Sequence, residues 1–142
     1  MIDVDLLKKV DIGTPHVAGY SYDGKVAAVK MLYDEACRYF GKPAVWTPSA
    51  SDALIPHKSI IADRSVQNSE KALLDIVRQC YDIVSDDLNL HMIVSLPDHE
   101  RRLYFQRLRR EYRIRREFFN TTVVGPPDGV ADTLLKIGFQ LA

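Results

Sequence analysis

The chain has 142 residues, enough for one domain or for a small domain with an appended segment. Hydrophobic residues make up 46% of it and charged residues 27%, which is the composition of an ordinary soluble globular protein. The formal net charge is zero, and no apolar stretch approaches the roughly 20 residues that span a bilayer. Neither nucleic acid nor a membrane is therefore expected as a partner.

The N-terminal part predicts one short strand and one long helix. The run Val10–Ile12 is typical of a short buried strand. A helix of about five turns is predicted to begin at Gly24, with Asp23 as its cap and Gly41 just beyond its end. Its apolar residues recur at steps of three and four, at Val26, Val29, Tyr33, Cys37 and Phe40. The first residues lack the basic and apolar regions of a secretory signal, so a cytoplasmic location is expected.

Residues 42–57 change in character and indicate a linker. Pro43, Pro48 and Pro56, with serines between them, disfavour regular structure. Trp46 is expected to anchor this segment to a neighbouring surface. The chain therefore divides into residues 1–41, the linker 42–57 and a domain over 58–142.

The first half of that domain predicts a strand, a helix and a second strand. Residues 59–62 suit a strand, and Asn68 or Ser69 suits the start of a helix. The apolar stripe of this helix is Leu73, Val77, Cys80, Tyr81 and Val84. The helix should end before Asp86 and Asp87, because carboxylates oppose the negative end of a helix dipole, and adjacent carboxylates usually belong to a turn. Met92–Val94 is a possible strand.

The second half predicts a helix over 97–118, a strand over 121–124 and a final helix. Asp128 is the expected cap of that final helix, and Gly138 should close it, with Phe139 folding back. The resulting order of strands and helices predicts an α/β sandwich of about 90 residues. Three amphipathic helices cover only one side of a small sheet, so we expect the remaining apolar surface to support self-association as a homodimer.

The stretch Thr14–Ser21 carries the candidate chemistry. A histidine exchanges a proton near neutral pH, so His16 on an exposed loop suits a general acid or base. Gly19 permits close backbone approach to a ligand, and Tyr20 supplies a hydroxyl. A loop histidine with a purely structural role is the alternative on pattern alone.

The same stretch resembles the histidine motif of the NAD-dependent D-2-hydroxyacid dehydrogenases. Further segments narrow the resemblance to the erythronate-4-phosphate dehydrogenases within that family and run through the chain in family order: 19–25, Tyr81–Ile83 with Asp86–Asp87, 108–112 running into 115–118, and 134–139. The resemblance implies that His16 is the catalytic proton donor and acceptor, that Gly19 lies near the NAD cofactor, and that Tyr20 contacts the substrate, 4-phosphoerythronate.

By the same resemblance, residues 1–41 belong to the NAD-binding and catalytic region of a Rossmann-type enzyme of pyridoxal 5′-phosphate biosynthesis, with the helix after Gly24 as a crossover helix. Residues 58–142 resemble its dimerisation domain. The sequence contains no G-x-G-x-x-G, and the family's catalytic arginine and carboxylate are expected upstream of Met1. Val26–Val29 also departs from a more polar family pattern. We therefore expect this chain alone to be inactive, to bind NAD weakly and to act mainly in dimerisation.

Arginines crowd the predicted helix 97–118, at positions 101, 102, 107, 109, 110, 113, 115 and 116. One hypothesis is a nucleic-acid-binding surface. The alternative, which the zero net charge favours, is a solvated face with Leu103, Leu108 and Tyr112 packed inward and pairs such as Arg113 with Glu117. A dimer interface that pairs arginines with Asp86 and Asp87 is also compatible.

Histidines and cysteines give no metal motif. His57, His91 and His99 lack ligand spacing, so no metal site is expected. Cys37 and Cys80 lie within apolar patterns that favour buried reduced thiols, although a disulfide between them stays open.

Overall fold

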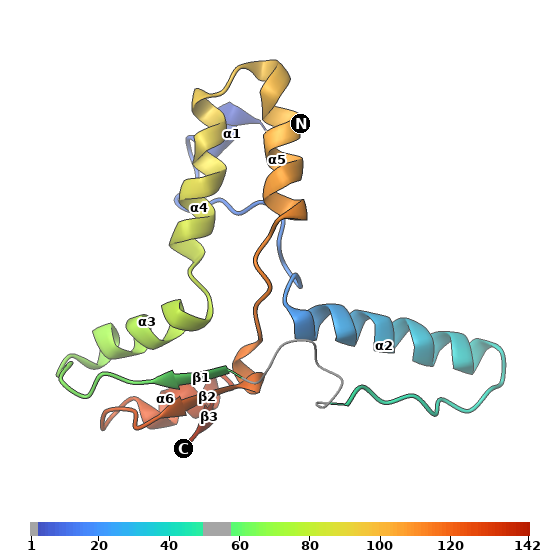
Figure 1. Ribbon diagram of the computed structural model, residues 1–142, viewed down its shortest axis with the longest axis vertical. Helices are drawn as coiled ribbons and strands as arrows, with labels where there is room; N and C mark the ends of the chain where they lie inside the picture. The colour runs from blue at the N-terminus through green and yellow to red at the C-terminus, as the bar shows by residue number, and fades with distance from the viewer. Residues whose placement is uncertain (1–2, 50–57) are drawn as a thin grey trace.

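The computed structural model describes residues 3–49 and 58–142 and confirms the α/β class (Figure 1). Its helices and strands, in chain order, are α1 (Val4–Leu7), α2 (Tyr22–Tyr39), β1 (Lys58–Ile61), α3 (Ser69–Cys80), α4 (Ile83–His91), the 3₁₀ turn η2 (Met92–Ser95), α5 (Asp98–Arg110), the 3₁₀ turn η3 (Phe118–Asn120), β2 (Thr121–Val124), α6 (Ala131–Lys136) and β3 (Gln140–Leu141). No helix among them is both long and apolar enough to cross a bilayer.

The three strands form a parallel sheet in the order β1-β2-β3. β-Branched residues fill the central strand β2, whose Val123 pairs with Ile60 of the edge strand β1, and both side chains are almost fully buried. They pack with one face of α3, with Leu134 of α6 and with Phe139, which folds back after Gly138 as predicted and stacks on Phe118. This small core is the base from which the other elements extend.

A second apolar cluster lies away from the sheet. Helices α4 and α5 stand as an antiparallel arm, and α1 lies against its far end (Figure 1). Leu7, Leu90 and Ile93 are the buried residues of this cluster. The segment that leads to the His16 loop is therefore carried by the arm, whereas α2 projects away from both arm and sheet.

In the N-terminal part, the structure differs from several of the predicted elements. Val10–Ile12 is a loop rather than a strand, because it follows α1, whose Leu7 packs on the α4 arm away from the sheet. Helix α2 begins at Tyr22 and is capped by the buried Ser21, whose Oγ accepts from the Gly24 N–H at 2.8 Å. Asp23, the expected cap, is turned instead to an ion pair described below.

The predicted apolar stripe of α2 is not buried within the described chain. Val29 and Phe40 are 56% and 70% exposed, and Asp23 is the one buried residue of the helix. Trp46 packs edge-on against Tyr33 at 5.6 Å between ring centroids, so the predicted anchor of the linker lies on α2 itself. Residues 50–57 of that linker, His57 among them, lie outside the described residues.

Differences in the second half have local causes. The expected single helix after Asn68 ends at Cys80, and a new helix, α4, is capped by Asp82. Asp86 and Asp87 thus lie within a helix rather than in a turn, and Asp86 is in its first turn, where the dipole favours a carboxylate. Met92–Val94 forms a 3₁₀ turn instead of a strand, since it closes the arm.

The last elements also depart from the pattern. Helix α5 ends at Arg110 rather than 118, and residues 112–117 continue as irregular chain back toward the sheet. Val130 occupies the cap position of α6 without a side-chain hydrogen bond, so Asp128 is not the cap. Strand β3, two residues long, is too short to leave a sequence signal. Cys37 and Cys80 are both free thiols, so the disulfide that the sequence left open does not form.

Candidate functional site

The loop 14–21 joins the arm to α2 and holds all three predicted site residues. Pro15 and Val17 are buried on either side of His16, which is itself exposed. His16 is the one non-glycine residue of the described chain with positive φ, at 58°. A residue with a Cβ atom pays roughly 1 kcal/mol of backbone strain in this left-handed region. Residues in such strained conformations cluster at functional sites. The buried flanks thus hold a strained, solvent-facing histidine.

Gly19 and Tyr20 follow in the same turn. Gly19 also has positive φ, at 71°, and a Cβ built on it would meet no atom within 4 Å, so its outer side is open. Tyr20 is half-buried, and its hydroxyl oxygen accepts a hydrogen bond from Nη2 of Arg109 at 3.1 Å. Its ring packs edge-on against Tyr112, with 5.9 Å between centroids. The loop is therefore completed by residues from the end of α5, about 90 positions away.

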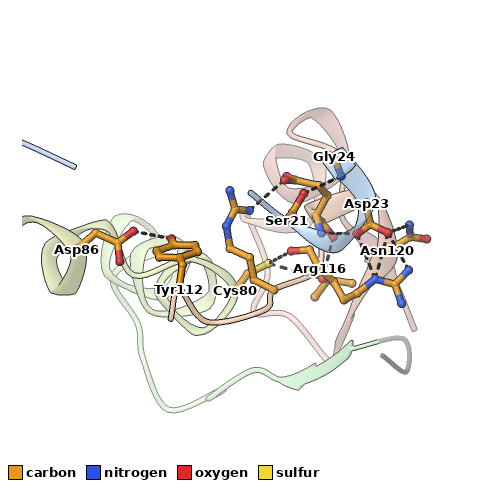
Figure 2. Close-up of polar contacts among 11 residues, drawn as sticks. Ser21, Asp23, Gly24, Cys80, Asp86, Tyr112, Arg116 and Asn120 are labelled. Atoms are coloured by element: carbon orange, nitrogen blue, oxygen red, sulfur yellow. Dashed lines mark hydrogen bonds and ion pairs between the residues drawn. The ribbon is translucent and has the colours of Figure 1, made fainter. Parts of the chain in front are cut away.

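A buried ion pair places the start of α2 directly after Tyr20 (Figure 2). Asp23 and Arg116 have side chains only 6% and 7% exposed. The Asp23 carboxylate accepts from Arg116 Nη2 at 2.9 Å, from the Glu117 N–H at 2.7 Å and from Asn120 Nδ2 at 2.9 Å. Burial raises the pKa of Asp23, but these hydrogen bonds and the Arg116 charge outweigh it and bring the pKa below its usual value.

A second buried carboxylate, Asp86 of α4, holds the chain that leaves α5 (Figure 2). It is 2% exposed and accepts from the Tyr112 hydroxyl at 2.6 Å and from Arg113 Nη1 at 2.8 Å. Burial together with this carboxylate raises the pKa of Tyr112 far above its usual range. Because the Tyr112 ring touches Tyr20, Asp86 also fixes one wall of the candidate site.

Asp87 and His91 hold the segment that enters the loop. Asp87 Oδ1 accepts from the Gly13 N–H at 2.7 Å. The two ring nitrogens of His91 face oxygens on opposite sides, with Nδ1 3.0 Å from the Asp87 carbonyl and Nε2 3.2 Å from the Leu7 carbonyl. The hydrogen bond that the His91 ring donates to the Asp87 carbonyl, together with the Asp87 carboxylate, raises the pKa of His91. These contacts attach α1 and the start of the His16 loop to α4.

Sequence reasoning found the loop but missed the residues that support it. Asp86 and Asp87 were interpreted as a turn, and their partners lie too far along the chain for a local pattern to connect them. The four-residue spacing of Asp87 and His91 was the available signal.

The arginine-rich segment is largely neutralised within the chain. Carboxylates of the described residues pair with five of its eight arginines: Arg101 with Asp98, Arg110 with Glu111, Arg113 with Asp86, Arg115 with Glu117 and Arg116 with Asp23. The expected Arg113–Glu117 pair is thus wrong, since each residue has another partner. Leu103, expected to pack inward, is 68% exposed.

No three His, Cys, Asp or Glu side chains cluster as a metal site within residues 3–49 and 58–142. His91 is engaged with Asp87 and Leu7, and His99 lies beside Glu100 on the exposed side of α5. The chemistry that these residues can offer is therefore hydrogen bonding, charge and proton transfer.

Comparison with known proteins agrees with the predicted resemblance. A family described as a domain of unknown function, DUF3410, matches residues 55–138. The chain is 36% identical to an erythronate-4-phosphate dehydrogenase of Marinobacter nauticus over 99% of its own length, which is 37% of the relative. Enzymes of the same name from Salinibacter ruber and Proteus mirabilis are 38% and 33% identical, over 87% and 98% of this chain and 32% and 35% of theirs. The chain thus spans about a third of the length of these relatives.

Proposed function

The chain belongs to the DUF3410 family, and from that premise we propose that it is part of an erythronate-4-phosphate dehydrogenase. The enzyme would oxidise the 2-hydroxyl of 4-phospho-D-erythronate with NAD as cofactor, in pyridoxal 5′-phosphate biosynthesis. The observation that carries the proposal is the extent of the similarity. It reaches across 99% of the chain and so includes residues 1–54, which the family model does not match but which contain the His16 loop.

In this proposal His16 handles the proton of the reacting hydroxyl. Oxidation of a secondary alcohol removes a hydride from carbon and a proton from oxygen, and an imidazole nitrogen accepts that proton. The exposure of His16 supports this role, because a substrate has to reach the ring. Within the described residues no carboxylate pairs with His16, so its orientation during the reaction needs groups beyond those contacts.

Tyr20 and Gly19 take the neighbouring roles in this proposal. The Tyr20 hydroxyl contacts the phosphorylated substrate, and the open side of Gly19 faces the cofactor. The described residues alone do not make a dinucleotide site, since the chain has no glycine-rich cradle for a pyrophosphate. In this proposal the chain's own contribution is the proton transfer and the substrate contact.

The chain itself is proposed to act in dimerisation. Its apolar core is small, and large apolar side chains stay exposed on α2 and on the arm, among them Met31, Leu32, Phe40, Leu88 and Leu103. Monomeric proteins rarely leave so much apolar surface uncovered, which supports a second copy of the chain as its partner.

Sedimentation equilibrium of the 142-residue chain tests the dimer. We expect the mass of a dimer at concentrations on the order of tens of micromolar, since interfaces of ordinary size reach such affinities. Leu32→Glu is expected to weaken the association if α2 lies in the interface, and Lys9→Glu, on the exposed turn after α1, serves as the charge-changing control. A chain that remains monomeric throughout this range would contradict the proposal.

A further inference from the structure

Two cations from distant parts of the chain converge on Tyr20. Lys25, on the first turns of α2, places Nζ 4.7 Å from the centroid of the Tyr20 ring. Arg109, on the last turn of α5, has its guanidinium carbon 5.5 Å from the same centroid and donates to the phenolic oxygen. Cation–π attraction holds each of them in place, but two positive charges beside one ring also repel each other.

Neither charge is neutralised by the described chain. The ion pairs of residues 3–49 and 58–142 give a carboxylate to Arg110, Arg113, Arg115 and Arg116 around this position but none to Lys25 or Arg109. The nearby Asp23 carboxylate is occupied by Arg116, Glu117 and Asn120. An excess of two positive charges therefore remains at Tyr20.

Hydrogen-bond donors remain at the same place. The Tyr20 oxygen accepts from Arg109, and because arginine has only donors, the Tyr20 O–H itself is left to donate to another group. The Arg109 Nε is buried and makes no hydrogen bond with the described residues. The Arg115 Nε is in the same condition, and an enclosed atom lies out of a ligand's reach, so an anion would meet Arg109 through its terminal N–H groups.

We propose that Tyr20, Lys25 and Arg109 form a binding site for a phosphate monoester. Such a group carries about −1.5 to −2 charges near neutral pH and three acceptor oxygens, which matches two cations and a free hydroxyl. The proposal rests on the proposed function, in which Tyr20 meets a phosphorylated substrate. It adds Lys25 and Arg109 as the residues that distinguish a phosphorylated hydroxy acid from an unphosphorylated one.

The test is a titration of the 142-residue chain with inorganic phosphate at constant ionic strength, followed by the backbone amide NMR signals. We expect saturable shifts centred on Tyr20, Lys25 and Arg109. Arg109→Gln should weaken phosphate binding by about tenfold or more, the size of a lost charge-assisted hydrogen bond. Lys25→Gln, at an exposed position that leaves folding intact, should weaken it by about threefold.

Arg110→Gln is the matched control, because it removes the same charge one residue further along α5 from an exposed side chain paired with Glu111. We expect it to change binding by less than about twofold. Equal losses in the Arg109 and Arg110 variants, or no saturable shifts at Tyr20, would overturn the site.

Competition separates the possible sources of the phosphate. Erythronate 4-phosphate should displace inorganic phosphate, whereas unphosphorylated erythronate and NAD, whose phosphates are diesters, should not. Displacement by NAD at similar concentration would overturn the assignment to a monoester. The result is independent of the dimer test: a phosphate-binding monomer would contradict dimerisation alone, and a dimer without phosphate shifts would contradict this site alone.

Discussion

At the scale of single residues, Asp23 links the candidate site to the sheet. It lies three positions after Tyr20, and its partners Arg116, Glu117 and Asn120 lie immediately before β2. A buried charge that loses its partner is strongly destabilising, because the remaining charge cannot reach water. The end of the His16 loop that leads into α2 is therefore attached to the sheet through this carboxylate.

Asp23→Asn should lower the free energy of unfolding by about 3–5 kcal/mol at neutral pH, since it removes the buried negative charge that the Arg116 guanidinium and the Glu117 N–H face. Asp34→Asn is the control on the same helix. Asp34 pairs with Lys30 at a partly exposed position, with 43% of the Asp34 side chain accessible, so its loss should cost less than about 1 kcal/mol. The pKa of Asp23 is lowered by folding, so its contribution is present above the unfolded pKa and disappears as pH falls through the folded one. Denaturant unfolding at neutral and acid pH measures both effects, and equal losses in the two variants would contradict the account.

At the scale of elements, His91 connects α1 to α4. Both of its ring nitrogens face carbonyl oxygens, which a doubly protonated imidazolium satisfies and a neutral ring cannot. The hydrogen bond that the His91 ring donates to the Asp87 carbonyl, together with the Asp87 carboxylate, raises the pKa of His91. A raised folded pKa gives stability that is complete below the unfolded pKa and is lost as pH rises through the folded value.

His91→Gln should therefore lower the melting temperature more at about pH 5.5 than at about pH 8, across the range in which histidine titrates. His99→Gln, on the exposed side of α5, should show no such difference between the two pH values. Thermal unfolding followed by circular dichroism measures this, together with amide exchange at Gly13. A His91 variant that loses the same stability at both pH values would show that charge has no part in the contact.

The sequence predicted the elements whose signals are local. Ile60 and Val123 lie in β-branched runs, and Asn68 precedes a clear amphipathic stripe, so β1, β2 and the start of α3 were found. The sequence did not predict the arm as a separate element. Its apolar pattern runs on from α3 past Tyr81–Asp82, although the helix breaks there and α4 begins at Ile83. Within the candidate site, Tyr20 was predicted, whereas Arg109 was one arginine among eight until the fold brought it to the Tyr20 hydroxyl.

At the scale of the whole molecule, the described chain has an exposed histidine, the Tyr20 hydroxyl and exposed apolar side chains, but no glycine-rich cradle for a dinucleotide. We expect isothermal calorimetry to give no micromolar affinity for NAD, because one open glycine supplies none of the contacts that hold a pyrophosphate. Heat of binding from NAD in the micromolar range would contradict this expectation. Inorganic phosphate in the same instrument serves as the positive control that the proposed anion site predicts.

Helix α2 also has a mechanical consequence. Its 18 residues make a rod of about 27 Å at 1.5 Å per residue, and Asp23 in the first turn is its one buried side chain. Buried contacts hold the helix at its N-terminal end, through Ser21, Asp23 and Arg116. A partner that packs on the exposed apolar residues near Phe40 would rotate the helix about these residues, the first of which follows Tyr20 directly. In the proposed dimer, the second copy that covers the far end of α2 would therefore influence the angle at which the His16 loop is presented.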